Sequence, residues 1–148
     1  AQLRDFSWWS GLSSRDASAG LELIRGEGER TLIDGKPYFS LYDDAAVLPE
    51  PPVALLLSIY DEYTLAYADR SAISNAREIE RMIVQGNAMT AVIVLHGKVA
   101  GTWKKMVKKD SIEIRLNPFR ELTDEEQEAV EREVQRYGRF FGRKAEVV

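Results

Sequence analysis

The chain has 148 residues, of which 45% are hydrophobic and 30% are charged, and its formal net charge is −4. A chain of this length can bury a core without staples, and the lack of cysteine excludes disulfide frameworks, cysteine-ligated zinc and thiol nucleophiles. A single histidine excludes histidine-cluster metal sites, no apolar run approaches the ~20 residues that span a bilayer, and no secretory signal opens the chain. We therefore expect a cytoplasmic protein with no metal, no cofactor and no membrane contact.

The first residues predict two short helices. One helical face carries the apolar side chains Leu3, Phe6, Trp9 and Leu12. Gly11 ends this helix, and Ser13 caps a second helix that runs to about Ile24.

A β-hairpin follows the helices. The segments Arg30–Ile33 and Tyr38–Leu41 are extended and are joined by the tight-turn sequence Asp34-Gly35-Lys36-Pro37. Two helices followed by a hairpin is the order of a helix-turn-helix with a wing, so we interpret residues 1–47 as a partial winged-helix domain. The leading helix of a full winged helix is missing, and Ala1 falls inside an amphipathic helix. We therefore expect the chain to be a fragment of a longer protein.

The second helix is poor in the side chains that read DNA. Arg15 is its only base, against Asp16 and Glu22. A helix that enters the major groove normally brings Arg, Lys, Asn or Gln to the base edges. We interpret this helix as a structural or interdomain element.

The remaining chain predicts a linker and a β-rich domain. Residues 48–52 hold three of the five prolines and predict a stiff linker. The following residues, 53–148, predict strands at 54–59, 91–95, 98–107 and 112–116, a helix from Ser74 to about Gly86, and a last helix from Thr123. The last three strands form an antiparallel meander, while residues 61–71 could be helix or loop. The predicted fold class is α+β.

Positive charge gathers on the predicted hairpin of this domain. Residues 98–120 hold seven basic side chains and only two acidic ones. The lysines beside Trp103 are Lys104, Lys105, Lys108 and Lys109. These five residues could contact nucleic-acid phosphates. The alternative is a solvated edge, since lysines on an edge strand also prevent aggregation.

A polar cluster follows the first strand of the β-rich domain. Its residues are Asp61, Glu62, Tyr63, Asp69 and Arg70. Carboxylates in such a place could act as acids or bases if burial raised their pKa. We favour a structural cluster of ion pairs and helix caps, because no second catalytic element accompanies it. The lone His96 lies in a predicted hairpin turn, and we assign no catalytic residue.

Three segments together resemble a known family. They are residues 3–12 (LRDFSWWSGL), 61–71 (DEYTLAYADRS) and 92–104 (VIVLHGKVAGTWK). In this order they resemble the C-terminal part of bacterial winged helix DNA-binding domain-containing proteins, a superfamily that includes the alkylpurine and crosslink DNA glycosylases. The resemblance implies that residues 1–47 correspond to the last of several tandem winged helices, and that 53–148 correspond to the β-rich C-terminal domain.

The resemblance also bears on catalysis. The glycosylases of this superfamily carry a Gln-x-Gln or Gln-x-Asp motif in an N-terminal winged helix, a region with no counterpart here. Gln85-Gly86-Asn87 echoes the spacing in another context, so no role is transferred to it. We therefore do not expect the fragment itself to be an enzyme.

Three functions are consistent with the sequence. The leading one is a DNA-associated module that contacts the phosphates of double-stranded DNA without sequence preference. The second is a non-catalytic portion of a DNA glycosylase that acts on damaged bases. The third is a purely structural domain. The expected partners are double-stranded DNA and the missing N-terminal winged-helix domains of the same chain.

Overall fold

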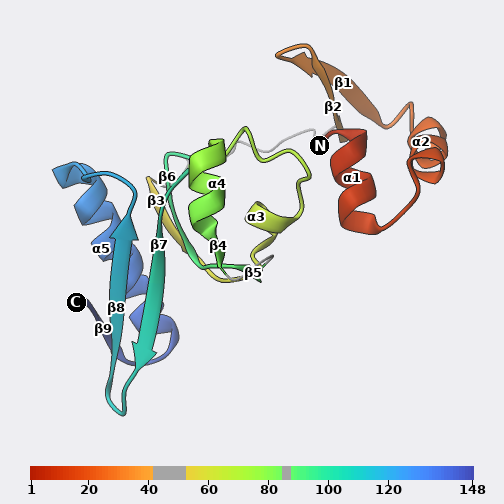
Figure 1. Ribbon diagram of the computed structural model, residues 1–148. Coiled ribbons are helices and arrows are strands. Elements are labelled where there is room, and N and C mark those ends of the chain that lie inside the picture. The colour runs from red at the N-terminus through yellow and green to blue at the C-terminus, as the bar shows by residue number, and fades with distance from the viewer. Residues whose placement is uncertain (42–52, 85–87) are drawn as a thin grey trace. The chain divides into compact units, whose positions relative to one another are not determined.

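A computed structural model describes residues 1–41, 53–84 and 88–148 (Figure 1). The predicted linker at 48–52 lies outside these residues. The described chain forms two compact units, one made of residues 1–41 and 62–70, the other of 53–61, 71–84 and 88–148. The sequence predicted that 62–70 belong to the β-rich domain, whereas the structure packs them with the N-terminal elements.

The first unit has the predicted order of helix, helix and hairpin. Its elements are α1 (Leu3–Ser10), α2 (Ser14–Leu23), β1 (Gly28–Ile33), β2 (Lys36–Leu41) and α3 (Glu62–Leu65). The turn is shorter than the predicted four residues, because Lys36 and Pro37 belong to β2 and only Asp34 and Gly35 lie outside the strands. Both turn residues have positive φ (49° and 75°). This geometry is the one that two-residue hairpin turns require. The winged-helix assignment itself stays a prediction.

The buried carboxylate of Asp5 explains why residues 62–70 join the first unit. Its Oδ1 accepts the backbone N–H groups of Ala68 at 3.2 Å and Asp69 at 3.4 Å, and its Oδ2 accepts that of Gln2 at 3.1 Å. Trp8 adds a hydrogen bond from its indole Nε1 to the Leu65 carbonyl at 2.9 Å. Buried polar groups are satisfied in this way, so the segment is fixed to α1 at several points.

The second unit is built on a five-stranded sheet. In chain order its elements are β3 (Ala54–Leu57), α4 (Ala76–Met82), the short strands β4 (Ile83–Val84) and β5 (Ala88–Met89), then β6 (Val92–Leu95), β7 (Lys98–Val107), β8 (Ser111–Pro118), α5 (Asp124–Phe140) and β9 (Lys144–Val147). The sheet order is β3-β6-β7-β8-β9. All neighbours are antiparallel except β8 and β9, which are parallel.

Sequence prediction and structure differ at three places in this unit. The predicted meander of β6, β7 and β8 is confirmed, but β9 was not predicted. The helix predicted to reach Gly86 ends at Met82, because β4 begins at the next residue. The helix predicted from Ser74 has Asn75 as its N-cap and begins at Ala76, whereas the final helix is capped by Thr123 as predicted.

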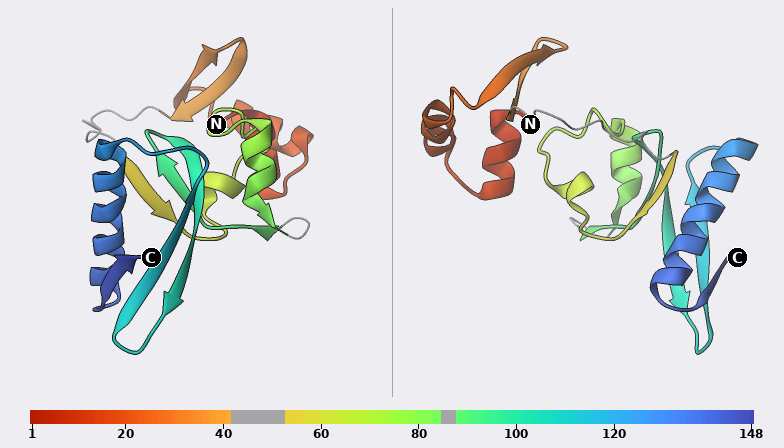
Figure 2. Two further views of the ribbon diagram at one scale, coloured as in Figure 1. Left: turned by 60° about the vertical axis from the view of Figure 1, so that its left-hand side comes forward. Right: turned by 180° about the vertical axis from the view of Figure 1, so that it is seen from behind.

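The core lies between α5 and one face of the sheet, while α4 lies on the other side (Figures 1 and 2). Its largest contributions come from Ile93, Leu95, Trp103, Ile112 and Ile114 of the sheet and from Ala129, Val130 and Val134 of α5. The hairpin of β7 and β8 extends past the ends of both helices. At its far end Met106 and Val107 are exposed, whereas Ile112 of β8 is fully buried.

Candidate nucleic-acid interface

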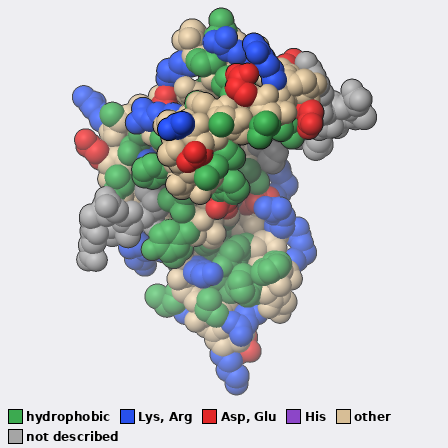
Figure 3. Space-filling model, turned by 90° about the vertical axis from the view of Figure 1, so that its right-hand side faces the viewer, with side chains coloured by type: hydrophobic (Ala, Val, Ile, Leu, Met, Phe, Trp, Pro, Cys, Tyr) green, Lys and Arg blue, Asp and Glu red, His purple; other side chains and the backbone are tan. Residues whose placement is uncertain are grey.

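The far end of the β7–β8 hairpin presents the predicted lysines in two different directions. Lys108 closes the turn, with its N–H donating to the Ser111 carbonyl at 2.8 Å. Successive side chains of a strand point to opposite faces. Lys105 therefore shares the face of buried Trp103, which α5 covers, and Lys104 stands on the opposite face. Figure 3 shows basic side chains gathered where the hairpin ends.

On the face away from α5, two cations are directly opposed. Lys104 of β7 pairs in register with Arg115 of β8, and both are exposed. No ion pair involves either side chain within the described residues. The next register pair on this face is Met106 with Glu113, and the Glu113 carboxylate forms an ion pair with the Lys108 ammonium.

Together with the turn residue Lys109, these side chains define the hairpin patch. It consists of Lys104, Lys108, Lys109 and Arg115, with Glu113 as its internal counter-ion and Asp110 beside it in the turn. Arg115 was counted among the basic residues of this region but was not predicted as a contact residue. The signal that could have identified it is strand alternation, which places it with Glu113 away from Ile112, Ile114 and Leu116.

Lys105 belongs to a separate environment. Its ammonium donates to the Tyr137 hydroxyl at 2.5 Å and lies 5.2 Å from the Tyr137 ring centre and 5.4 Å from that of Phe141. These contacts hold the side chain against the end of α5. The four predicted lysines therefore do not form one surface.

Trp103 cannot contact a ligand at the surface, which corrects its predicted role. Only 4% of the residue is exposed, and its indole Nε1 donates to the Leu57 carbonyl at 2.9 Å. Its ring packs edge-on against Tyr137, with 5.3 Å between ring centres. Trp103 anchors the hairpin to the core from the inside.

The predicted polar cluster is divided between the two units. Asp61 falls in the second unit, while the other members lie in the first. Asp69 forms an ion pair with Lys36 at 2.5 Å, which raises the pKa of the lysine. The Arg70 Nε donates to the Thr64 carbonyl at 2.6 Å, and burial raises the pKa of Tyr63. These contacts fit the structural interpretation.

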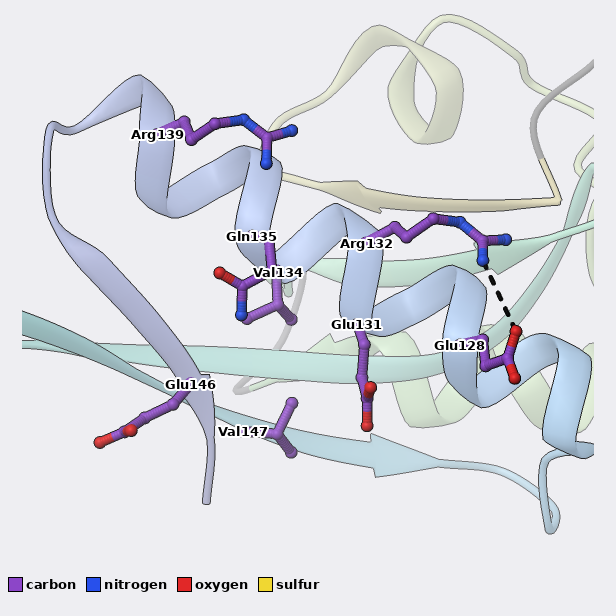
Figure 4. A pocket seen from close by; sticks show the side chains of 8 residues that line it. All are labelled: Glu128, Glu131, Arg132, Val134, Gln135, Arg139, Glu146 and Val147. Carbon is purple, nitrogen blue, oxygen red and sulfur yellow. Dashed lines mark ion pairs between the residues drawn. The ribbon is translucent and has the colours of Figure 1, made fainter.

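A groove lies between α5 and β9, at the edge of the sheet (Figure 4). It is lined by Glu128, Glu131, Arg132, Val134, Gln135, Arg139, Glu146 and Val147. The lining holds three carboxylates and two guanidinium groups, and Glu128 and Arg132 are linked by an ion pair at 3.8 Å. This balance disfavours phosphates. Across the described ranges, no three acidic or histidine side chains converge in a way that would hold a metal.

The Glu126 carboxylate has a strongly lowered pKa, and its contacts stabilise the fold. Arg120 donates two N–H groups to the two oxygens of buried Glu126, each at 2.7 Å, and the Thr123 N–H adds a third bond at 3.0 Å. These contacts, with the Arg120 bond as the largest cause, lower the pKa of Glu126 to about 2. His96 Nε2 lies 3.8 Å from the same carboxylate, at an exposed hairpin turn. The site ties β6, the β8–α5 connection and α5 together.

Two further expectations concern the Gln85-Gly86-Asn87 sequence and membrane-spanning helices. Gln85-Gly86-Asn87 lies outside the described residues. Within 1–41, 53–84 and 88–148, no helix combines the length and the apolar character needed to cross a membrane.

Comparison with known proteins places this architecture in a family. The chain superposes over its full length on the DNA glycosylase AlkZ of Streptomyces sahachiroi, with a TM-score of 0.75, 19% sequence identity and 42% of the AlkZ chain covered. The chain therefore spans less than half of that protein. No curated protein sequence matches it. The family described as DNA glycosylase AlkZ-like matches residues 1–140. The chain thus belongs to the AlkZ-like family of DNA glycosylases.

Proposed function

We propose that this chain is a DNA-contacting, non-catalytic part of a DNA glycosylase, in which the hairpin patch binds backbone phosphates of duplex DNA without sequence preference. The observation that carries the proposal is the register pair of Lys104 and Arg115. These two exposed cations face each other and have no ion-pair partner in the described part of the chain.

Two cations opposite each other lower the stability of the free protein. Like charges directly opposite each other on adjacent strands destabilise a sheet. A phosphate would relieve the repulsion, because it can bridge an ammonium and a guanidinium at once. Phosphate contacts of this kind position a protein on DNA and carry no sequence information.

The overall charge of −4 does not contradict this proposal. The charge is unevenly distributed, since α5 begins with Asp124, Glu125 and Glu126 and the hairpin patch is basic. Exposed charges further apart than about 10 Å are largely screened at 0.1 M salt. A local basic surface can therefore bind a phosphate even on an acidic chain.

We place catalysis outside the described chain. Asp69, Glu113 and Glu126 act in ion pairs or helix caps, and no described residue corresponds to the catalytic motif that the resemblance implies. We propose that further winged-helix domains of the same protein are its partners and supply the reacting groups. The family membership supports this second part of the proposal.

The test is fluorescence anisotropy of a labelled duplex with the 148-residue chain at low salt. Lys104→Glu/Lys109→Glu should weaken binding by about tenfold or more, because two phosphate contacts become repulsive. The matched control is Arg25→Glu/Arg132→Glu, which changes net charge equally at exposed residues that do not belong to the hairpin patch. An equal loss of duplex affinity in both double variants, or no duplex binding by the unmodified chain, would contradict the proposal. The interpretation of the chain as a purely structural domain would then remain.

A further inference from the structure

Four aromatic rings form a continuous ladder from the core to the surface at the end of α5. Ring centres are separated by 5.3 Å from Trp103 to Tyr137, 5.0 Å from Tyr137 to Phe141, and 5.1 Å from Phe141 to Phe140. Exposure rises along it, from 4% for Trp103 to 44% for Phe141 and 83% for Phe140. The inner rings thus fix the position of two outer rings that face solvent.

One cation lies beside the exposed rings, and a second follows them in the chain. The Lys105 ammonium lies 5.4 Å from the Phe141 ring centre and donates to the Tyr137 hydroxyl. Arg143 follows the ladder in the chain and donates its Nη1 to the Lys108 carbonyl at 3.2 Å. Neither forms an ion pair within the described ranges, while the nearby acids Glu113 and Glu146 are paired with Lys108 and Lys144.

We propose that Phe140 and Phe141, with Lys105 and Arg143, form a stacking site for unpaired bases of single-stranded DNA. This inference deepens the proposed function and rests on DNA being the ligand of the chain. Exposed rings offer a face to any base, and the adjacent cations suit the phosphates on either side of it. The arrangement has the aromatic and cationic parts that single-strand binding uses.

The surface favours an unpaired strand over other occupants. Bases inside a duplex are already stacked, so they cannot cover Phe140 without leaving the helix. An apolar protein partner would have to bury the charges of Lys105 and Arg143. Burying a charge without a carboxylate partner costs free energy, which disfavours such a complex. A single strand can place a base on the ring and leave both cations next to its phosphates.

The experiment uses the 148-residue chain and a single-stranded oligonucleotide that contains 2-aminopurine, whose fluorescence is quenched by stacking. Phe140→Ala should lose the quenching and bind the single strand about tenfold more weakly. Its binding to duplex should stay unchanged. Because Phe140 is almost fully exposed, the substitution leaves the core intact.

Three comparisons complete the test. Phe140→Leu keeps apolar surface but loses the ring, and should bind the single strand as weakly as Phe140→Ala, whereas Phe140→Trp keeps an aromatic ring and should retain the quenching. The matched control is Leu23→Ala, an 87% exposed side chain in the first unit, which should change nothing. Full binding by Phe140→Leu, or release of a self-associated form by Phe140→Ala in sedimentation, would overturn the inference.

The same experiment separates this inference from the proposed function. Lys104→Glu/Lys109→Glu should reduce duplex binding while 2-aminopurine remains quenched at saturating protein. If duplex binding holds and Phe140→Ala has no effect on the single strand, only the stacking site is wrong. If neither nucleic acid binds the unmodified chain, the proposed function fails with it.

Discussion

Lys104 and Arg115 face each other across β7 and β8 on the sheet surface that α5 does not cover. A pair of like charges in this position lowers stability. Lys104→Glu would replace the repulsion with a cross-strand ion pair. We expect the variant to gain a few tenths of a kcal/mol, up to about 1 kcal/mol, in urea unfolding, while its affinity for duplex DNA falls.

A gain in stability together with a loss of affinity cannot come from misfolding. Lys104→Thr serves as the control, because it removes one charge without adding a partner for Arg115. It should bind more weakly than the unmodified chain and more strongly than Lys104→Glu. A Lys104→Glu variant that binds duplex normally would remove Lys104 from the interface.

The Glu126 carboxylate makes stability dependent on pH. Its pKa is lowered to about 2 in the folded chain, from an ordinary value of 4.5. A group with a lowered folded pKa contributes stability that is fully present above the ordinary value and is lost as the pH falls toward the folded value. Unfolding free energy should therefore fall between about pH 4.5 and pH 2.

Glu126→Gln isolates this contribution. At pH 7 the variant should lose about 2 kcal/mol, because the ion pair is lost and one of the two oxygens that accept from Arg120 becomes an NH2 group, which cannot accept. The difference from the unmodified chain should shrink as the pH approaches 2. Glu128→Gln is the exposed control on the same helix. A difference that stays constant from pH 7 to pH 2 would show that Glu126 is not the group responsible.

Gly138 allows β9 to pack closely against α5. A methyl group there would lie 2.6 Å from the Arg143 carbonyl oxygen and 2.9 Å from the Ala145 Cβ. Gly138→Ala should therefore cost about 1–3 kcal/mol, although alanine favours helix. Gly20→Ala in α2, with open space around it, should instead stabilise by up to about 1 kcal/mol. Thermal unfolding of both variants followed by circular dichroism measures the contrast.

Asp5 is the connection between α1 and residues 62–70. Asp5→Ala leaves the N–H groups of Ala68 and Asp69 without their acceptor, at a cost of about 1–3 kcal/mol. Hydrogen exchange at these two amides should accelerate, while exchange in β7 and β8 stays slow. Glu22→Ala, an exposed carboxylate of the same unit, should leave both amides protected. Unchanged exchange in Asp5→Ala would contradict this role.

The elements that the sequence predicted best are those with local signals. The two hairpins have turns at Asp34-Gly35 and His96-Gly97, where all four residues have positive φ. Such turns favour Asn, Asp and Gly, so Asp34-Gly35 is a local sequence signal for a hairpin. The final helix is amphipathic and capped by Thr123. The family resemblance was likewise confirmed at the level of an AlkZ-like glycosylase.

The features that sequence reasoning missed depend on distant contacts. β9 pairs with β8 across a helix of 17 residues, and its four residues carry no strong pattern of their own. The placement of 62–70 depends on the carboxylate of Asp5, far earlier in the chain. Charge counting grouped Lys104 with Lys105, whereas strand alternation places them on opposite faces.

The salt dependence of duplex binding tests the central claim most directly. If the hairpin patch contacts phosphates, log Kd should rise linearly with log salt concentration, with a slope of about 0.9 for each phosphate neutralised. In Lys104→Glu/Lys109→Glu this slope should be lower by about 2, since two contacts are lost. An unchanged slope in that variant would contradict the account, because the phosphates would then be held by another surface.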